Sequence, residues 1–209
     1  RWDSSNWLPT FAPSSRREPV HRSFPKEMEE FDFERIRQCY ADAAVRCREG
    51  GIDGVEITFA SLTLIEQFLS PAVNHRTDEY GGSAENNVRA AIEACQLVRE
   101  AIGPDKLIIL RLSQDGVDAF GGAWPDGVRY AEAIGKALEN APIDALHWSS
   151  FDWRDNRDPN SDVPMPKVLK EASGLPMIVN GGVAEGADVE EVITSGAGDL
   201  VAVGRPLFA

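Results

Sequence analysis

The sequence predicts an α/β fold built around a parallel β-sheet. From about residue 32 onward, helix-like and strand-like segments alternate five times. Each strand-like segment is apolar on both faces, as in a parallel sheet that helices cover. The long polar loops follow the carboxyl ends of these strands, where ligands bind in such folds. Both a doubly wound sheet and a (β/α)8 barrel fit this pattern, although only five strands are evident.

The helices are predicted from their end signals and apolar stripes. Asp32 is a plausible N-cap for a helix that runs to about Glu49. Ser83 caps a second helix, which stops at Gly103. Pro125 suits the first turn of a third helix. Two shorter helices are expected over residues 164–172 and 187–194.

Five short apolar runs predict the strands. They are Val55–Ile57, Leu107–Leu112, Ile143–Trp148, Met177–Asn180 and Leu200–Val203. Arg111 is the one charged residue in its run, and a buried guanidinium needs an anionic or carbonyl partner. A flavin edge or a carboxylate would serve. The alternative is a structural ion pair with Glu56 or Asp144.

A long excursion separates the first strand from the second long helix. It spans residues 58–82 and carries a polar cluster at 74–78 before Gly81 and Gly82. Connections in α/β units usually take a few residues, so this loop is expected to build a site. The Arg76–Asp78 region is expected to hold the excursion in place, with His75 as part of the same scaffold.

Composition excludes several classes of function. The chain has 209 residues, and its net charge of −13 argues against a nucleic-acid partner. No apolar run is as long as a membrane span, and the first residues lack the apolar core of a signal peptide, so we expect a cytoplasmic protein without a membrane partner. The three cysteines are far apart and suggest reduced thiols with no metal site.

Glycines end the last two strands. Gly181 and Gly182 follow one, and Gly204 and Arg205 follow the other. Backbone amides at such glycines can approach an anion closely, and the arginine adds a positive charge. The two loops therefore predict a phosphate site. The alternative is that the glycines only make tight turns.

Several motifs resemble the Old Yellow Enzyme family of FMN-dependent NADH:flavin oxidoreductases. They are G-x-D-G-V-E-I, Q-F-L-S-P-x-x-N-x-R-T-D-E-Y-G-G-S-x-E-N, L-R-L-S, N-G-G and D-L-V-x-V-G-R-P-L, and together they run from about Phe31 to Phe208. The segment 12–36 resembles the branch that includes trimethylamine dehydrogenase and the dimethylglycine and N-methylproline demethylases.

This resemblance implies a TIM (β/α)8 barrel with FMN at its mouth. The five strands would be the fourth to the eighth, so the barrel is incomplete. Residues 31–209 would form this carboxyl-terminal part of the barrel, and residues 1–30 an irregular arm. Arg111 would approach the flavin pyrimidine edge. Gly181, Gly182, Gly204 and Arg205 would hold the FMN phosphate.

The resemblance also locates the substrate-anchoring positions, which the family fills with His, then His or Asn, then Tyr. Here they are Thr58, Ser61 and Thr63. An aliphatic hydroxyl is a far weaker acid than a phenol, so protonation of an alkene is disfavoured. We therefore expect oxidation or demethylation of a small methylated amine, ahead of reduction of an enone with NADH or NADPH.

Four aromatic residues suggest a cage for a methylated ammonium. Phe59, Trp148, Phe151 and Trp153 lie at strand ends or in the following loops, and a cation is attracted to such rings. The alternative is that they pack at the rim. His147 is interpreted as a core or rim histidine rather than a catalytic one.

A second hypothesis belongs to another class. Without its first three strands the barrel has two open edges, which predicts a chain that is unstable alone. It would then be a truncated or degenerate, non-catalytic fragment that needs a complementing chain or forms a homo-oligomer.

Overall fold

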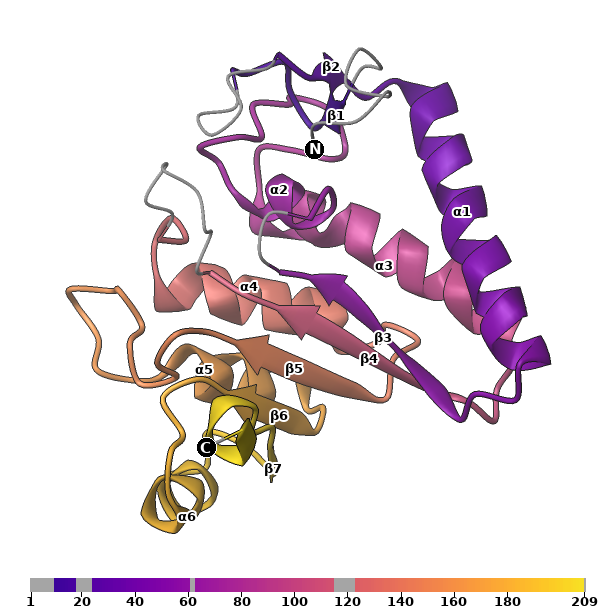
Figure 1. Ribbon diagram of the computed structural model, residues 1–209. Coiled ribbons are helices and arrows are strands. Elements are labelled where there is room, and N and C mark those ends of the chain that lie inside the picture. The colour runs from indigo at the N-terminus through magenta and orange to yellow at the C-terminus, as the bar shows by residue number, and fades with distance from the viewer. Residues whose placement is uncertain (1–9, 18–23, 61–62, 115–122, 209) are drawn as a thin grey trace.

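A five-stranded parallel sheet is the centre of the chain (Figure 1). The computed structural model describes residues 10–17, 24–60, 63–114 and 123–208. The strands are β1 (Phe11–Ala12), β2 (Lys26–Glu27), β3 (Gly54–Phe59), β4 (Leu107–Leu112), β5 (Ala145–Ser149), β6 (Met177–Asn180) and β7 (Leu200–Val201). The large sheet has the order β3-β4-β5-β6-β7, and every pair in it is parallel. The predicted α/β parallel fold is thus confirmed.

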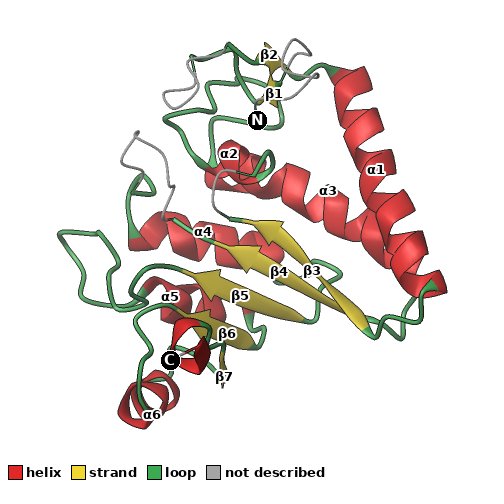
Figure 2. Cartoon of the chain, viewed as in Figure 1, coloured by secondary structure: helices red, strands yellow, loops and turns green. Residues whose placement is uncertain are grey.

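Helices alternate with these strands (Figure 2). They are α1 (Glu30–Glu49), α2 (Glu66–Leu69), α3 (Ala84–Ile102), α4 (Val128–Leu138), α5 (Met165–Ser173) and α6 (Gly186–Thr194), followed by a 3-10 turn, η1 (Arg205–Phe208). All five predicted helices are present, but Pro125 precedes the third one, which begins at Val128 after its N-cap Gly127. The four-residue α2 was not predicted, because it lies within the excursion and is too short to show a helical period.

The first helix begins two residues earlier than its predicted cap. Glu29 is the N-cap, and its backbone N–H donates to Asp32 Oδ2 at 2.9 Å. Asp32 is therefore the third helical residue of a capping box, and its prediction as N-cap is wrong. Ser83 is the N-cap of α3 as predicted, since its Oγ accepts a hydrogen bond from Asn86 N at 3.2 Å.

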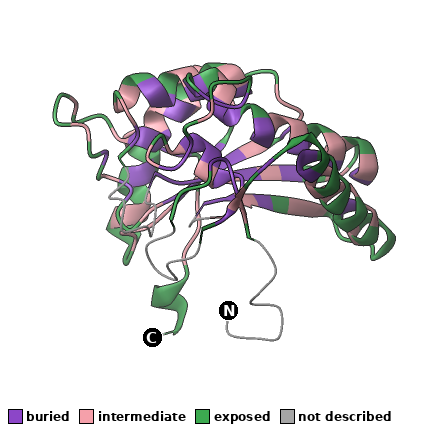
Figure 3. Cartoon of the chain, turned by 90° about the horizontal axis from the view of Figure 1, so that it is seen from above, coloured by how far each residue is buried: buried purple, intermediate pink, exposed green. Residues whose placement is uncertain are grey.

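The two faces of the sheet have different environments. Alternate residues such as Phe59, Leu110 and Trp148 are fully buried on the face toward the helices. The helices gather on that side (Figure 3). On the other face, Leu107 is 55% exposed and Leu200 57% exposed. We call this second side the open face.

The sheet is also open at both edges. β3 pairs only with β4, and β7 only with β6, among the residues that the structure describes. A closed barrel has no such edges.

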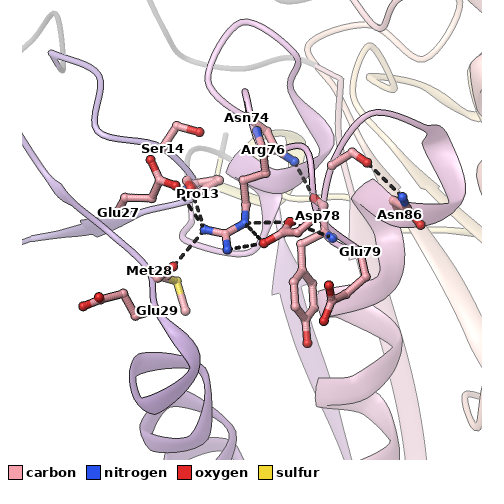
Figure 4. A network of polar contacts seen from close by, with 12 residues as sticks. Pro13, Ser14, Glu27, Met28, Glu29, Asn74, Arg76, Asp78, Glu79 and Asn86 are labelled. Carbon is pink, nitrogen blue, oxygen red and sulfur yellow. Dashed lines mark hydrogen bonds and ion pairs between the residues drawn. The ribbon is translucent and has the colours of Figure 1, made fainter.

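The excursion holds the amino-terminal arm through Arg76 (Figure 4). The guanidinium donates to the backbone oxygens of Pro13 at 3.0 Å and Met28 at 2.8 Å. Its Nε lies 3.0 Å from both carboxylate oxygens of Asp78. The short pair β1–β2 lies in the arm, in the part of residues 1–30 that the structure describes. The prediction that the Arg76–Asp78 region holds the excursion in place is confirmed, and the same contacts fasten the arm.

Two further sequence predictions concern the cellular location of the protein and the state of its cysteines. Within the described ranges, no helix has the length and apolar character needed to cross a membrane. The cytoplasmic location stays a prediction. Cys39, Cys47 and Cys95 are free thiols. Burial raises the pKa of the Cys95 thiol to about 12, so this thiol stays protonated.

Candidate active site

The predicted flavin residues gather at the carboxyl-terminal edge of the sheet. Arg111 lies one residue before the end of β4, Gly181 follows β6 directly, and Gly204 comes shortly after β7. Parallel strands end at the same edge, so the sheet brings these segments to one side of the molecule. β6 and β7 pair through Val179 and Val201, which makes their loops neighbours.

Arg111 points to the open face and has only part of its hydrogen-bonding capacity filled. Its Nη2 donates to Ser149 Oγ at 2.7 Å, and its Nη1 lies 3.7 Å from Glu56 Oε1. Its Nε is buried and has no partner among the described residues. Of the two ion pairs considered from the sequence, only the one with Glu56 forms. Asp144 instead binds Arg99 at 2.6 Å.

His147 belongs to the same cluster. It is the register partner of Arg111 on the neighbouring strand, and its Nδ1 lies 2.6 Å from Glu56 Oε2. The residue is 7% exposed, and its Nε2 has no partner in the described part of the chain. We call Glu56, Arg111, His147 and Ser149 the Glu56 cluster. The pair of Arg111 with Glu56 was considered from the sequence, but His147 and Ser149 were missed, although the two-residue period of the strands places all four on one face.

The glycines after β6 are required by the backbone itself. Gly181 has a φ of +103° and Gly182 of +67°, where side chains are disfavoured. A β-carbon on Gly181 would lie 2.0 Å from the backbone oxygen of Ser150. The tight-turn alternative therefore explains these two glycines without a ligand. It does not exclude an anion beside them.

Carboxylates occupy the side of this turn that faces α6. Arg154 lies 3.3 Å from Asp152 Oδ1 and 2.9 Å from Asp188 Oδ1. Asp188 also accepts hydrogen bonds from the backbone N–H groups of Ala184 and Glu185, which hold the pKa of its carboxyl below the ordinary value. The amides at the start of α6 are thus already occupied. An anion would fit better on the other side, toward Gly204 and Arg205.

Arg205 is available for such a contact. It begins η1, is exposed, and has no polar partner among the described residues. An unpaired guanidinium at the end of a strand loop can bind a phosphate bidentately. Its role stays a prediction.

The structure describes two of the three predicted substrate-anchoring positions, Thr58 and Thr63. Thr58 lies on the open face as the register partner of Arg111. The Thr63 hydroxyl donates to the backbone oxygen of Thr58 at 3.1 Å, so it is engaged in closing the turn after β3. Ser61 lies outside the described residues. The proximity of Thr58 to Arg111 fits a substrate position, and the catalytic roles stay predictions.

The predicted four-residue aromatic cage is not formed. Phe59 and Trp148 are fully buried on the face toward the helices, and their rings pack against Tyr40 and Trp124. Trp153 is 1% exposed. Only Phe151, 67% exposed, presents its ring to solvent. The cage hypothesis is wrong for Phe59 and Trp148, because the two-residue period of a strand directs them away from the open face.

A cavity of about 550 Å³ lies elsewhere. It is lined by residues of the excursion and of the first turns of α3 and α4, including Asn74, Arg76, Ser83 and Arg129. None of the predicted flavin or substrate residues lines it. We therefore place the candidate site on the open face, where Arg111 Nε and His147 Nε2 are buried without a partner among the described residues.

The open face presents a hydrogen-bond donor that could bind the pyrimidine edge of a flavin. A buried guanidinium N–H without an acceptor is costly, and a pyrimidine oxygen or nitrogen would satisfy it. Arg111 could hold that edge, and the Gly204–Arg205 segment could hold a phosphate. These are two of the contacts that an FMN site would use.

Comparison with known proteins decides the family. The model of the NADH:flavin oxidoreductase / NADH oxidase family matches residues 8–209. The chain belongs to this family. The resemblance to the Old Yellow Enzyme family is therefore confirmed.

Curated relatives of this NADH:flavin oxidoreductase family member are longer than the chain itself. N,N-dimethylglycine/sarcosine dehydrogenase of Chromohalobacter salexigens is 34% identical over 218 residues, which cover 100% of this chain and 31% of the relative. The probable N-methylproline demethylase of Rhizobium meliloti is 43% identical over 150 residues, or 70% of this chain and 21% of the relative. The multifunctional alkene reductase/demethylase OYE of Caballeronia cordobensis is 34% identical and is covered to 31%.

Solved structures of Old Yellow Enzyme type share the fold. Morphinone reductase in complex with tetrahydroNAD matches with a TM-score of 0.79 and 25% identity, over 96% of this chain and 57% of that chain. The old yellow enzyme homologue from Zymomonas mobilis also matches with a TM-score of 0.79, at 23% identity, over 58% of its length. The predicted incomplete TIM barrel is confirmed by this partial coverage.

Proposed function

We propose that this chain supplies the FMN-binding carboxyl-terminal part of an Old Yellow Enzyme-type oxidoreductase. The observation that carries the proposal is the Nε of Arg111, which is buried on the open face and has no partner in the described part of the chain, in a member of the NADH:flavin oxidoreductase family. FMN, when bound, supplies the hydride chemistry. The chain would orient the flavin through Arg111 and bind its phosphate through Gly181, Gly182, Gly204 and Arg205.

We propose a small methylated amine as the substrate, which would be oxidised or demethylated. Two relatives named as a dimethylglycine/sarcosine dehydrogenase and a probable N-methylproline demethylase support this choice. The Thr63 hydroxyl supports it as well, because it donates to the backbone oxygen of Thr58 and an aliphatic hydroxyl is a poor proton donor. Amine oxidation does not need that proton donor.

Reduction of an enone with NADH or NADPH is the second candidate reaction. The relative named as an alkene reductase/demethylase and the likeness to morphinone reductase favour it. It would require a proton source other than Thr63. In both cases the partner is a small molecule, and we propose no nucleic-acid or membrane partner.

A different class of function remains the alternative. The edges of β3 and β7, which have no further strand partner among the described residues, and the exposed Leu107 and Leu200 favour a fragment that acts only with a complementing chain or as a homo-oligomer. The chain spans about a third of the first relatives and just over half of the matched structures, so a complementing set of strands would close the barrel.

One spectrum separates these proposals. FMN is added to the purified chain, unbound flavin is removed by gel filtration, and the visible absorption of the protein peak is recorded. Retained flavin bands with a stoichiometry near one support the FMN proposal, and anaerobic bleaching by methylated amines or by NADH then tests the two reactions. A folded chain that retains no flavin contradicts FMN binding by this chain and favours the complementing-chain alternative.

A further inference from the structure

We infer that Glu56 is a positioning residue that orients Arg111 and His147 on the open face and offsets part of the positive charge of Arg111 beside a bound flavin. This inference rests on the proposed FMN binding and deepens it. Arg111 would contact the flavin edge, whereas Glu56 would act through Arg111.

The two oxygens of the Glu56 carboxylate are divided between two cationic or donor groups. Oε2 lies 2.6 Å from His147 Nδ1, and Oε1 lies 3.7 Å from Arg111 Nη1. Glu56 comes from β3, Arg111 from β4 and His147 from β5. One carboxylate thus links three neighbouring strands on the open face.

The register explains why the carboxylate lies below the guanidinium. Arg111 pairs with Thr58 on one side and with His147 on the other. Glu56 pairs with Ile109, two residues closer to the amino end of the strands. Glu56 therefore approaches Arg111 and His147 from the side away from the carboxyl-terminal edge, which leaves that edge free for a ligand.

The hydrogen bond to Glu56 also fixes the histidine ring. A carboxylate only accepts hydrogen bonds, so the proton of this bond is on His147 Nδ1. The ring cannot turn over without losing this contact. Its Nε2 and the Arg111 Nε are the two buried nitrogen atoms of the cluster that have no partner among the described residues.

The charge of Glu56 has a measurable consequence for a flavin. Two-electron reduction places negative charge on the pyrimidine side of the ring, and a guanidinium there stabilises the reduced form. The negative charge of Glu56 offsets part of the positive charge of Arg111. The side chains of Glu56 and Arg111 are each about a third exposed, so water screens their interaction only in part. Replacing Glu56 by Gln keeps the shape, removes the offset and should raise the midpoint potential of the flavin.

The first experiment compares midpoint potentials of the FMN-loaded chain by dye-coupled reduction. Glu56→Gln should favour reduction about tenfold, which corresponds to a positive shift of about 30 mV for a two-electron couple. Ser149→Ala removes a neutral acceptor from Arg111, and should weaken FMN binding about fivefold without raising the potential. Glu100→Gln is the matched control, since it removes the same charge from an exposed position on α3.

The outcomes of this experiment are separate from those of the flavin-binding test. An FMN-loaded Glu56→Gln variant with the potential of the parent chain overturns the inference and leaves the proposed function standing. An equal shift in Glu100→Gln also overturns it, because the effect would then be one of net charge alone. A parent chain that binds no FMN overturns the proposed function and the role of Glu56 toward the flavin together.

The second experiment needs no flavin. In the chain with ¹⁵N-labelled histidine, the Nδ1–H proton of His147 should give a strongly downfield signal with slow exchange, and Glu56→Gln should shift it upfield. The other two histidines, His21 and His75, are assigned by single replacement with Asn. Absence of a protected Nδ1–H signal from His147 in the parent chain overturns the positioning role directly, whatever the outcome with FMN.

Discussion

Gly135 on α4 and Ala172 on α5 lie so close that a β-carbon on Gly135 would be 2.6 Å from the β-carbon of Ala172. The added β-carbon on Gly135 would also lie 3.1 Å from the backbone oxygen of Leu169. The glycine therefore permits the close approach of two helices that cover the sheet. We expect Gly135→Ala to lower the free energy of unfolding by about 1–3 kcal/mol through overpacking, as measured by urea denaturation.

Gly186 provides the matched control for this packing prediction. It begins α6, and a β-carbon there would meet nothing within 4 Å. Gly186→Ala should be neutral or should stabilise the chain by up to about 1 kcal/mol, because it restricts the unfolded state. Equal losses in both variants would show that loss of glycine, rather than helix contact, is responsible.

Arg76→Lys should loosen the amino-terminal arm. Lysine keeps the charge but cannot contact Asp78, Pro13 and Met28 at once, as the guanidinium does. The Arg76 side chain is largely buried, so we expect the free energy of unfolding to fall by about 1–3 kcal/mol. Limited proteolysis should cut the arm of this variant faster.

The control for the arm prediction is Arg89→Lys. Arg89 is exposed and donates to the backbone oxygen of Glu79. Its replacement should leave cleavage of the arm unchanged. If both variants are cut equally fast, Arg76 does not fasten the arm.

Asp199 should give the chain a pH-dependent contribution to stability. Its Oδ1 accepts from Lys170 Nζ at 2.7 Å and its Oδ2 from Met177 N at 2.9 Å. The hydrogen bond from Lys170, followed by that from Met177, lowers the pKa of the Asp199 carboxyl. Because the folded-state pKa lies below the unfolded value of about 3.9, the stabilisation is present above that value and is lost as the pH falls through the folded-state pKa.

The measurement for Asp199 is the melting temperature of the parent chain and of Asp199→Asn as a function of pH. The variant should melt at a lower temperature at about pH 7, and the difference should narrow below about pH 5. Asp105→Asn, at an exposed position before β4, is the control and should change little. A difference for Asp199→Asn that stays constant down to about pH 3 would contradict the assignment.

The sequence was informative where a local pattern has a local cause. The Ser83 hydroxyl caps α3 by accepting a hydrogen bond from the backbone N–H of Asn86, three residues later. This contact involves no distant segment, so the local sequence is enough to predict it. The apolar runs of the strands and the motif between Arg76 and Tyr80 are recognisable for the same reason, although only Leu107–Leu112 and Met177–Asn180 have the predicted bounds at both ends. Local patterns gave the parallel sheet and the motifs gave the family, which together predicted most of the fold.

The missed features depend on contacts between distant segments. Glu56 and His147 are 91 positions apart, and only the register of three strands brings them together. Phe59 and Trp148 stand in the right segments for a cage, but their place in the two-residue period turns them toward the helices. A site residue on a strand is therefore predictable only when its face is assigned along with its position.

Arg205→Ala should weaken FMN binding without weakening the fold. Arg205 is exposed and has no polar partner in the described part of the chain, so its loss should leave the melting temperature of the flavin-free chain unchanged. A charge-assisted contact to a phosphate should be worth about 1.4 kcal/mol or more, which is a tenfold rise in the Kd for FMN measured by fluorescence quenching. Lys136→Ala removes an exposed charge on α4 and serves as the control.

Riboflavin, which lacks the phosphate, tests whether Arg205 contacts that group. Since the phosphate is the only part of the ligand that this arginine would contact, riboflavin should bind both Arg205→Ala and the parent chain with equal affinity. A variant that loses riboflavin and FMN alike would mean that Arg205 acts on the shape of the loop rather than on the phosphate.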